Sequence, residues 1–265
     1  MPDPGFYPDI PEALYHADPG SLSVSGAKNL LKSPALFRYR SDNPEHKDAF
    51  DFGSAFHTKA LGVGPDIAVF DGASFYSKAG RAFQAEARNE GRTPITAADD
   101  EHTTAMAKAV HDNPDAMRWL TGDLEISAYA VDPDTGVMRR GRFDALGDLA
   151  IGDLKSTRDA SPESFTRDVV NFRYFMQAAW YLDLAADLGH PAVGFAFVAV
   201  EKVPPYLIGI YELDAEALDL GRALNRRALD LFRECTTTAQ WPGYSGGQPW
   251  QTLSLPPWAF KEEIS

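Results

Sequence analysis

The sequence predicts a mixed α/β (α+β) domain in which helices flank a central mixed sheet. Three observations lead to this prediction. Strand-like segments joined by short turns form a three-strand meander, a nearly continuous apolar segment further on is typical of a strand buried on both faces, and helical patterns stand before, between and after them. A chain of 265 residues can bury enough apolar surface for such a domain, and its single cysteine excludes an intrachain disulfide.

The first 120 residues predict an irregular arm followed by a helical part. Residues 1–20 are rich in proline and glycine, which punctuate regular structure. After this arm, Ser23 or Ser25 can cap one helix and Pro34 can open the next. The helices expected within 21–120 are 23–40 in two pieces, 53–62, 97–111 and 114–120. Residues 63–93 show no pattern that predicts an element.

Residues 121–238 predict the core of a single domain. The sequence DPDTG and the pair Gly147 and Asp148 are turn signals that separate the strands of the meander. The strands expected are 125–131, 137–146, 149–157, 192–200 and 206–213, and the helices are 162–170, 172–188 and 214–234. Residues 239–265 hold three of the five tryptophans and predict an irregular C-terminal wrap.

The meander carries two carboxylates and a lysine on neighbouring strands. Asp153 and Lys155 are two residues apart, so their side chains point to one face of the third strand. The turn at 147–148 can place Asp144 opposite Asp153, with Cβ atoms about 5 Å apart. Such carboxylates repel each other unless a cation lies between them, and their oxygens suit Mg²⁺ or Mn²⁺. The pattern therefore predicts a metal site beside a lysine, although surface aspartates with a salt-bridging lysine fit the same short match.

The charge of the chain is unevenly distributed. A net charge of −13 argues against a general nucleic-acid coat protein, because phosphate neutralisation needs a basic surface. Residues 21–40, however, hold four basic residues and no acidic ones, so a local face can still bind a polyanion. The N-terminus lacks a signal-peptide pattern and no apolar run reaches the length of a membrane span, so we expect a cytoplasmic protein.

The order of these elements and motifs resembles the PD-(D/E)XK nuclease superfamily, whose core is a helix, a three-strand meander, a helix and a further strand. In this resemblance Asp144 takes the place of the first motif's aspartate, and Asp153, Leu154 and Lys155 form the (D/E)XK triplet. Phe143 stands where many members have a proline. The resemblance implies a restriction-endonuclease-like core that hydrolyses phosphodiester bonds with a divalent metal held by Asp144, Asp153 and the Leu154 carbonyl.

Three further residues resemble the RecB-like branch of that superfamily. Gln177 and Tyr181 lie four residues apart after the meander and match its QxxxY motif, which implies that they brace the catalytic site or contact the DNA backbone. His57, in FGSAFHTKALG, matches an upstream helix in which a histidine joins the metal. Glu125, at the start of the first strand, is a candidate additional ligand. Each of these residues could also have an ordinary structural role. Their occurrence together, in the expected order along the chain, favours the resemblance.

Segments along nearly the whole chain, including both ends, resemble the RecE-type exonucleases, the exodeoxyribonuclease VIII family. The matching segments are LSVSGAKNLLKSPALFRYR, DPDTGVMRRGRFDAL, EKVPPYLIGIYEL, and WPGY followed by LPPWA, so the similarity spans roughly residues 12–260. It implies a Mg²⁺- or Mn²⁺-dependent exonuclease of phage-type recombination that degrades linear duplex DNA from 5′ ends. The 3′ single strand left behind would pass to a RecT-type annealing protein, and a ring-shaped homo-oligomer would thread the DNA.

The DNA-binding residues expected on this basis come from the N-terminal helices and from the second strand of the meander. They are Ser25, Lys28, Lys32, Arg38, Arg140 and Arg142. Three alternatives stay open. One is a RecB-like endonuclease or single-strand nuclease without an iron–sulfur cluster, which one cysteine cannot hold. The others are a non-catalytic module that binds DNA ends and a carboxylate enzyme such as a glycosidase, in which Lys155 would have no evident task.

Overall fold

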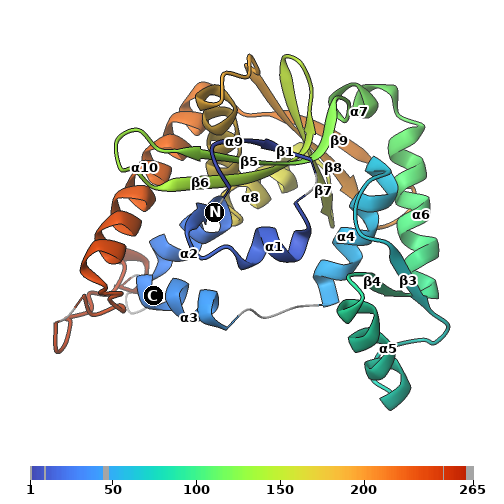
Figure 1. The fold of residues 1–265 in the computed structure, drawn as a ribbon, viewed down its shortest axis with the longest axis horizontal. Helices are drawn as coiled ribbons and strands as arrows, with labels where there is room; N and C mark the ends of the chain where they lie inside the picture. Colours follow the sequence, from blue (N-terminus) through green and yellow to red (C-terminus); the bar gives the residue numbers. More distant parts are fainter. Residues whose placement is uncertain (1, 9, 44–47, 247, 261–265) are drawn as a thin grey trace.

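A seven-stranded mixed sheet forms the centre of the computed structural model, which describes residues 2–8, 10–43, 48–246 and 248–260 (Figure 1). Its strands follow the order β1-β5-β6-β7-β8-β9, and β2 pairs with β6 outside this path. The meander β5-β6-β7 is antiparallel, whereas β7 and β8 are parallel, which confirms the predicted fold class. The strands are β1 (Gly5–Tyr7), β2 (Ser21–Ser23), β5 (Asp123–Val131), β6 (Met138–Leu146), β7 (Ala150–Thr157), β8 (Gly194–Glu201) and β9 (Ile208–Glu212).

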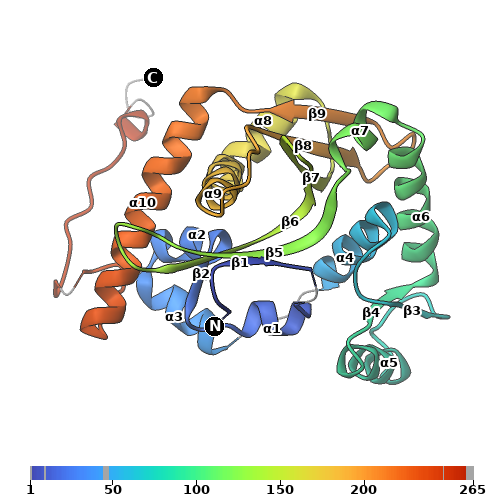
Figure 2. The same ribbon diagram turned by 45° about the horizontal axis from the view of Figure 1, so that its top comes forward.

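Helices flank this sheet on both sides. In Figure 2, α8 and α9 lie on one side of the β5–β6 hairpin, and α1 and α3 lie on the other. Each helix expected from the sequence occurs, with ends shifted by a few residues at most positions. The helices around this sheet are α1 (Glu12–Ala17), α2 (Val24–Lys32), α3 (Pro34–Asp42), α4 (Asp48–Leu61), α6 (Ala97–His111), α7 (Pro114–Trp119), α8 (Pro162–Asn171), α9 (Tyr174–Asp187) and α10 (Ala215–Thr238). In the described ranges, no helix has the length and apolar character needed to cross a membrane.

Two buried clusters hold the helices onto the sheet. One contains Trp180 of α9 and Phe197 of β8, and the other contains Phe56 of α4 and Leu154 of β7. Burying a side chain of this size contributes about 1.5–3 kcal/mol. Successive side chains of a strand point to opposite faces, so Leu154 enters the second cluster while Asp153 is directed toward α9. The packing of Leu154 thus fixes which way its two polar neighbours point.

The prediction of an irregular arm at residues 1–20 is wrong for two parts of that segment, Gly5–Tyr7 and Glu12–Ala17. β1 pairs antiparallel with β5, α1 follows, and Ser21–Ser23 pairs parallel with β6. The buried Arg140 fixes this path, because its Nη1 donates to the carbonyl oxygens of Asp18 at 2.9 Å and Ser21 at 2.6 Å. These partners are more than one hundred residues away in sequence, so local composition could not reveal them.

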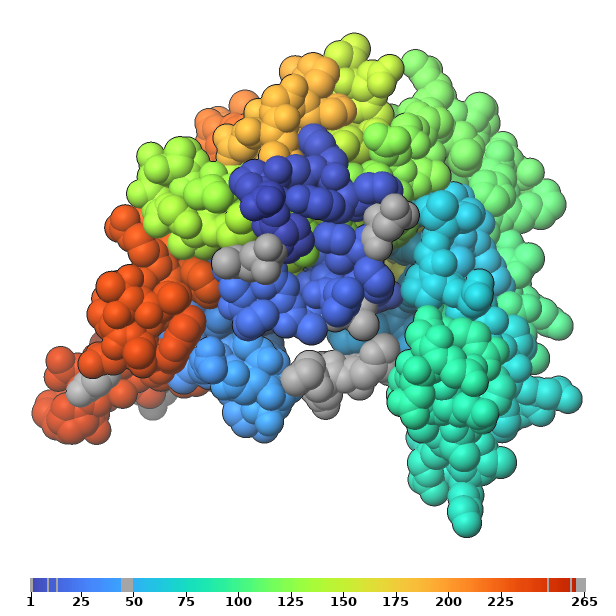
Figure 3. Space-filling view, in the orientation of Figure 1, coloured from blue at the N-terminus to red at the C-terminus, as the bar shows by residue number. Residues whose placement is uncertain are grey.

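Residues 67–96 form a small lobe for which the sequence predicted no element. β3 (Ile67–Phe70) and β4 (Thr93–Thr96) make a separate parallel pair, and α5 (Lys78–Asn89) connects them. Figure 3 shows that this lobe, which we call the α5 lobe, projects from the rest of the molecule. It contacts the body through α4 and α6.

The C-terminal segment follows the expected irregular course over its described part. Among residues 239–246 and 248–260, the only regular element is a short 3₁₀ helix at Pro257–Phe260. Trp241 stacks on Phe37 of α3 with ring centroids 5.5 Å apart, and the Pro242 carbonyl accepts a hydrogen bond from the Ala35 backbone. These contacts attach the beginning of the segment to α3.

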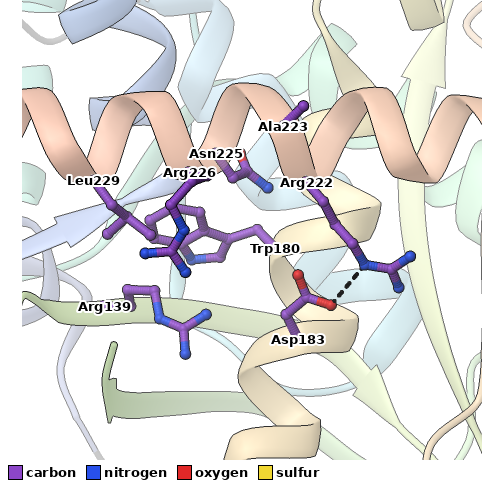
Figure 4. Close-up of a pocket in the computed structure, with 8 residues that line it drawn as sticks. All are labelled: Arg139, Trp180, Asp183, Arg222, Ala223, Asn225, Arg226 and Leu229. Carbon is purple, nitrogen blue, oxygen red and sulfur yellow. Dashed lines mark hydrogen bonds and ion pairs between the residues drawn. The ribbon is translucent and has the colours of Figure 1, made fainter. Parts of the chain in front are cut away.

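A cavity of about 360 Å³ lies between β6, α9 and α10 (Figure 4). Three arginines line it, and each has a carboxylate partner. Arg222 Nε donates to Asp183 Oδ1 at 3.0 Å, Arg226 forms two hydrogen bonds with Asp132, and Arg139 pairs with Asp187. This network joins α10 to α9 and to the meander, and its charges are already balanced within the protein.

The backbone of α10 closely approaches the start of α9 at Gly221. A Cβ at this position would lie 2.3 Å from the Phe175 carbonyl oxygen, whereas a Cβ at Gly53 in α4 would have no neighbour within 4 Å. We therefore expect Gly221→Ala to destabilise the fold by about 1–3 kcal/mol and the matched Gly53→Ala to stabilise it by about 0.5–1 kcal/mol. Urea unfolding of both variants measures this difference, and a stabilised Gly221→Ala would contradict the packing described.

Candidate metal centre

The site is formed where strands β6 and β7 separate. The two strands share only two register pairs, Ala145 with Gly152 and Leu146 with Ile151. Continuing this register would align Asp144 with Asp153, as the sequence predicted. The ladder ends one residue earlier, however, because the Leu154 backbone N–H donates to Asp144 Oδ2 at 2.7 Å instead of to a β6 carbonyl. The separation leaves room between the strands for polar side chains.

Glu125 enters this space from β5. Its neighbours in β5 pair with Ala145 and Phe143, so the register aligns Glu125 with Asp144. Its φ of 53° lies in the left-handed region, which costs a residue other than glycine on the order of 1–3 kcal/mol. The surrounding ladder holds the residue in this conformation. The structure thereby supports the inclusion of Glu125 in the site.

His57 approaches the two carboxylates from α4. Its Nδ1 lies 3.6 Å from Asp144 Oδ2, and one ligand atom each of His57, Glu125 and Asp144 lies within 4.8 Å of the others. Burial lowers the pKa of His57 to about 4. The charge of Lys155 lowers this pKa further, and the charge of Asp153 opposes the shift. The imidazole is therefore neutral at pH 7, which is the form that binds metals.

Asp153 lies beside this group but has other partners. Its side chain is almost fully buried, and Gln177 Nε2 of α9 donates to its Oδ1 at 2.6 Å. Its Oδ2 forms an ion pair with Lys155. The Lys155 Nζ also lies 5.2 Å from the centroid of the Tyr174 ring, a distance at which an ammonium is attracted to an aromatic face. Asp153 therefore positions Lys155 at the edge of the His57, Glu125 and Asp144 group.

The electrostatics of the site fit a divalent cation. Burial raises the pKa of Glu125 to about 8, and the charge of Asp144 adds to this effect. Burial also raises the pKa of Asp144, and that of Asp153 to about 6 even though Lys155 opposes the shift. One buried carboxylate, Asp153, and two half-buried ones, Glu125 and Asp144, are thus held in a place that disfavours their charges. A cation among them would relieve this cost, and one imidazole with carboxylate and carbonyl oxygens suits Mn²⁺ and is compatible with Mg²⁺.

The predicted metal ligands therefore fall into two groups. His57, Glu125 and Asp144 are close enough to share one ion, and the Leu154 backbone is next to His57 and Asp144. Asp153 is not part of the three-residue group, because Gln177 and Lys155 occupy its oxygens. Asp144 and Asp153 are neighbours, as the sequence predicts, and the role of Asp153 as a metal ligand stays a prediction.

Tyr181 of α9 packs against β6, the strand that carries Asp144. It is buried one turn after Gln177, and its ring packs against Phe143 with centroids 5.0 Å apart. A Cβ at Gly141 would lie 3.0 Å from this ring, so α9 approaches β6 closely here. Burial raises the pKa of Tyr181 well above its ordinary value, which keeps the phenol neutral. We assign Tyr181 a positioning role for β6 rather than a place among the groups around the carboxylates.

The predicted DNA-binding residues are divided between the site, the surface and the interior. Lys28 of α2 lies near the site, with its Nζ 5.6 Å from the centroid of the same Tyr174 ring that Lys155 approaches. Burial, and then the charge of Lys155, lower its pKa to about 7. Ser25 and Lys32 are exposed on the same helix.

The three arginines of that set already have partners within the protein. Arg38 is exposed and forms an ion pair with Asp42 at 2.9 Å. Arg142 is half-buried and donates to Ser127 Oγ and to the Ile10 carbonyl oxygen. Arg140 is buried and is bound to the segment before α2. The expectation that Arg140 and Arg142 face DNA is therefore corrected, because both guanidinium groups anchor the N-terminal segment.

Two residues near the site were missed by sequence reasoning. The ammonium groups of Lys28 and Lys155 both lie over the ring of Tyr174. Tyr174 stands three residues before Gln177, on the same helix face, and this spacing could have indicated that it lies near the site. The negative charge of Glu12 of α1 adds to the rise in the pKa of Glu125. The same charge opposes the fall in the pKa of His57. Glu12 was missed because its segment was expected to be irregular and remote.

Protons and a divalent cation compete for the same carboxylate oxygens. Because the pKa of Glu125 is raised to about 8 and that of Asp153 to about 6, these groups ionise between pH 6 and pH 8 while His57 stays neutral. We expect Mn²⁺ to raise the Tm more at pH 8 than at pH 6, as measured by calorimetry. Asp144→Asn should abolish this increase, whereas Asp183→Asn, outside the group, should retain it. An equal increase at both pH values would contradict the assignment.

Comparisons with known proteins identify the family and the fold. Residues 23–249 match the family model described as "PDDEXK-like domain of unknown function (DUF3799)". No curated protein matches the chain. The crystal structure of a "putative exonuclease" from Eubacterium rectale superposes with a TM-score of 0.65 at 14% identity, over 97% of this chain and 98% of that one.

A second solved structure, that of SSO0001, has a TM-score of 0.38 at 15% identity over 86% of this chain and 80% of that one, which is too low to support an argument. The likeness to the Eubacterium rectale protein shows the fold alone. The family match covers most of the residues that form the sheet and its helices. The chain therefore belongs to the PDDEXK-like family DUF3799, and its central sheet has the fold of that nuclease superfamily.

Proposed function

We propose that this protein is a divalent-metal-dependent exonuclease that hydrolyses phosphodiester bonds of linear duplex DNA in the 5′ to 3′ direction. The observation that carries the proposal is the placement of Lys155 and Asp153 beside the His57, Glu125 and Asp144 group. Three neighbouring carboxylates with raised pKa values, one buried and two half-buried, are typical of a functional site rather than of a purely structural cluster. A lysine at the edge of such a group fits phosphate chemistry.

The residues of the site divide the work of hydrolysis between them. His57, Glu125 and Asp144, with the Leu154 carbonyl, would hold the divalent ion, Mg²⁺ or Mn²⁺. When bound, that ion supplies activation of water and stabilisation of the leaving oxygen. Asp153 forms the ion pair that orients Lys155. The charges of Asp153 and Asp144 raise the pKa of Lys155, although burial opposes this shift. The ammonium of Lys155 therefore stays charged and can offset negative charge on the phosphate as it is attacked.

Residues of α9 keep these groups in place. Gln177 donates to Asp153 and fixes the carboxylate that holds Lys155. Tyr174 limits the positions of the ammonium through its ring, and Tyr181 holds β6 against α9. Because α9 supplies all three residues, a change in this helix would displace Lys155 relative to Asp144.

The exonuclease activity and its polarity rest on the RecE-type sequence motifs, and the name given to the structurally similar Eubacterium rectale protein supports the same class. With these motifs we propose a role in phage-type recombination in the cytoplasm, a RecT-type annealing partner and a ring-shaped homo-oligomer. Such a ring would reconcile DNA binding with the net charge of −13, since DNA would meet a basic lining around Lys28 and Lys32 while the acidic exterior faces solvent.

A linear duplex labelled at either the 5′ or the 3′ end tests this activity directly. With Mg²⁺ we expect release of the 5′ label and growth of a 3′ single strand, and with EDTA no release. A covalently closed circle should stay intact, because an exonuclease needs an end. Cutting of the circle would identify an endonuclease of the same superfamily, and no cleavage with either Mg²⁺ or Mn²⁺ would contradict the enzymatic proposal.

Substitution of Lys155 separates catalysis from metal binding. We expect Lys155→Ala to lower the rate by at least about 100-fold, because a charge that stabilises the transition state is lost. The ligands of the ion remain, so Mn²⁺ should still raise the Tm, whereas Asp144→Ala should lose both properties. Lys108→Ala, which removes an exposed lysine paired with Asp112, serves as the control and should cleave at the wild-type rate. A Lys155→Ala variant with a near-wild-type rate would refute the assignment.

A further inference from the structure

The α5 lobe contains a cavity of about 480 Å³ that the metal centre does not use. Its walls come from the N-terminal half of α4, the turn before α5, the first part of α5, and the junction of β4 with α6. Phe52 of α4 lines the cavity and lies five residues before His57, which corresponds to an axial rise of about 7.5 Å. The cavity therefore begins on the same helix that supplies a metal ligand.

An exposed aromatic ring stands at the mouth of this cavity. Tyr76 is 88% exposed, although its neighbours are firmly held. Phe75 stacks on Phe70 with centroids 5.5 Å apart, and the Ser77 hydroxyl accepts a hydrogen bond from the Gly80 backbone at the start of α5. A Cβ at Gly80 would lie 2.8 Å from the Phe75 Cα, so only glycine permits this close packing. A fixed turn thus presents a large ring to solvent.

One basic side chain in the cavity wall, Arg81, is available to an anion. The α5 lobe, residues 67–96, carries four basic and three acidic residues in a chain with a net charge of −13. Arg81 lines the cavity, is exposed, and has no carboxylate partner in the described part of the chain. The two carboxylates in the wall already have partners, because Asp51 pairs with Arg88 and Asp99 accepts from the Thr96 hydroxyl. Arg81 is left to bind a group from outside.

We propose that the α5 lobe binds an unpaired nucleotide of a DNA single strand, with Tyr76 stacked on the base and Arg81 paired with the phosphate. Proteins that bind single strands combine these two features, an aromatic platform and a basic contact to the backbone. A cavity of this volume is within the range of small-ligand pockets and can admit one base. This inference rests on the proposed function, because it assumes that the substrate is DNA, and it adds a contact to the unpaired strand.

Binding of a short fluorescent single strand, measured by anisotropy in Ca²⁺ to limit turnover, tests the proposal on the full chain. We expect Tyr76→Ala to weaken binding about tenfold, since loss of stacking on one base has this effect. Tyr76→Phe should bind as the wild type does, because the ring remains. Tyr244→Ala, which removes a 73% exposed ring from the C-terminal segment, is the matched control and should bind normally.

An abasic strand of the same length separates stacking from charge. The wild type should bind it about tenfold more weakly than the strand with bases, and Tyr76→Ala should bind both equally. Arg81→Gln should weaken the binding of both strands, because both keep their phosphates. Equal binding of the two strands by the wild type, or unchanged binding by Tyr76→Ala, would overturn the proposal.

A free mononucleotide serves as the last probe. It is compared with an unlabelled single strand at the same total concentration of nucleotides, as a competitor of the fluorescent strand. If the two competed equally well, the cavity would be a mononucleotide site and the strand assignment would be overturned. We expect much weaker competition, because only a strand also contacts the protein beyond the cavity. These comparisons are made between variants without cleavage, so they can fail while the wild type still degrades duplex DNA, and they can succeed even if it does not.

Discussion

Electrostatic repulsion among three neighbouring carboxylates, one of them buried and two half-buried, is the constraint on which the rest of this structure depends. Glu125, Asp144 and Asp153 converge where β6 and β7 separate, and burial raises the pKa of each. Proteins rarely keep such a group without a compensating charge. Here Lys155 compensates Asp153, and a divalent cation is the natural counterpart of the remaining two carboxylates and His57. Binding of the ion and the chemistry of the site therefore have a single physical origin.

The fold supplies the rigidity that this arrangement needs. Leu154 fixes the orientation of its two polar neighbours because its own side chain is fully buried against α4 and α6. α9 holds the opposite side through Gln177, and the adjoining network of arginines and aspartates joins α9 to α10 (Figure 4). The left-handed conformation of Glu125 is maintained by the ladder on either side of it. Each residue of the His57, Glu125 and Asp144 group is thus positioned by an element with its own core contacts, which favours a preorganised site.

Much of this organisation was readable in the sequence, because it depends on local patterns. Turn signals separated the strands of the meander, and the spacing of Asp153 and Lys155 placed both on one face. The features that were missed depend on distant contacts. Arg140 binds carbonyl groups of the N-terminal segment more than one hundred residues away, so the order of residues 5–23 could not be predicted. The separation of β6 from β7 depends on one hydrogen bond between the Leu154 backbone and Asp144, which no propensity encodes.

Anomalous diffraction from crystals grown with Mn²⁺ tests the central claim most directly. We expect a peak within coordination distance of His57, Glu125 and Asp144, with Lys155 close by but not bound to the ion. The peak should vanish in crystals of Glu125→Gln if this residue is a ligand. Strong peaks found only elsewhere, or a site in which Lys155 still pairs with Asp153 while no ion binds the other three residues at saturating Mn²⁺, would contradict the account.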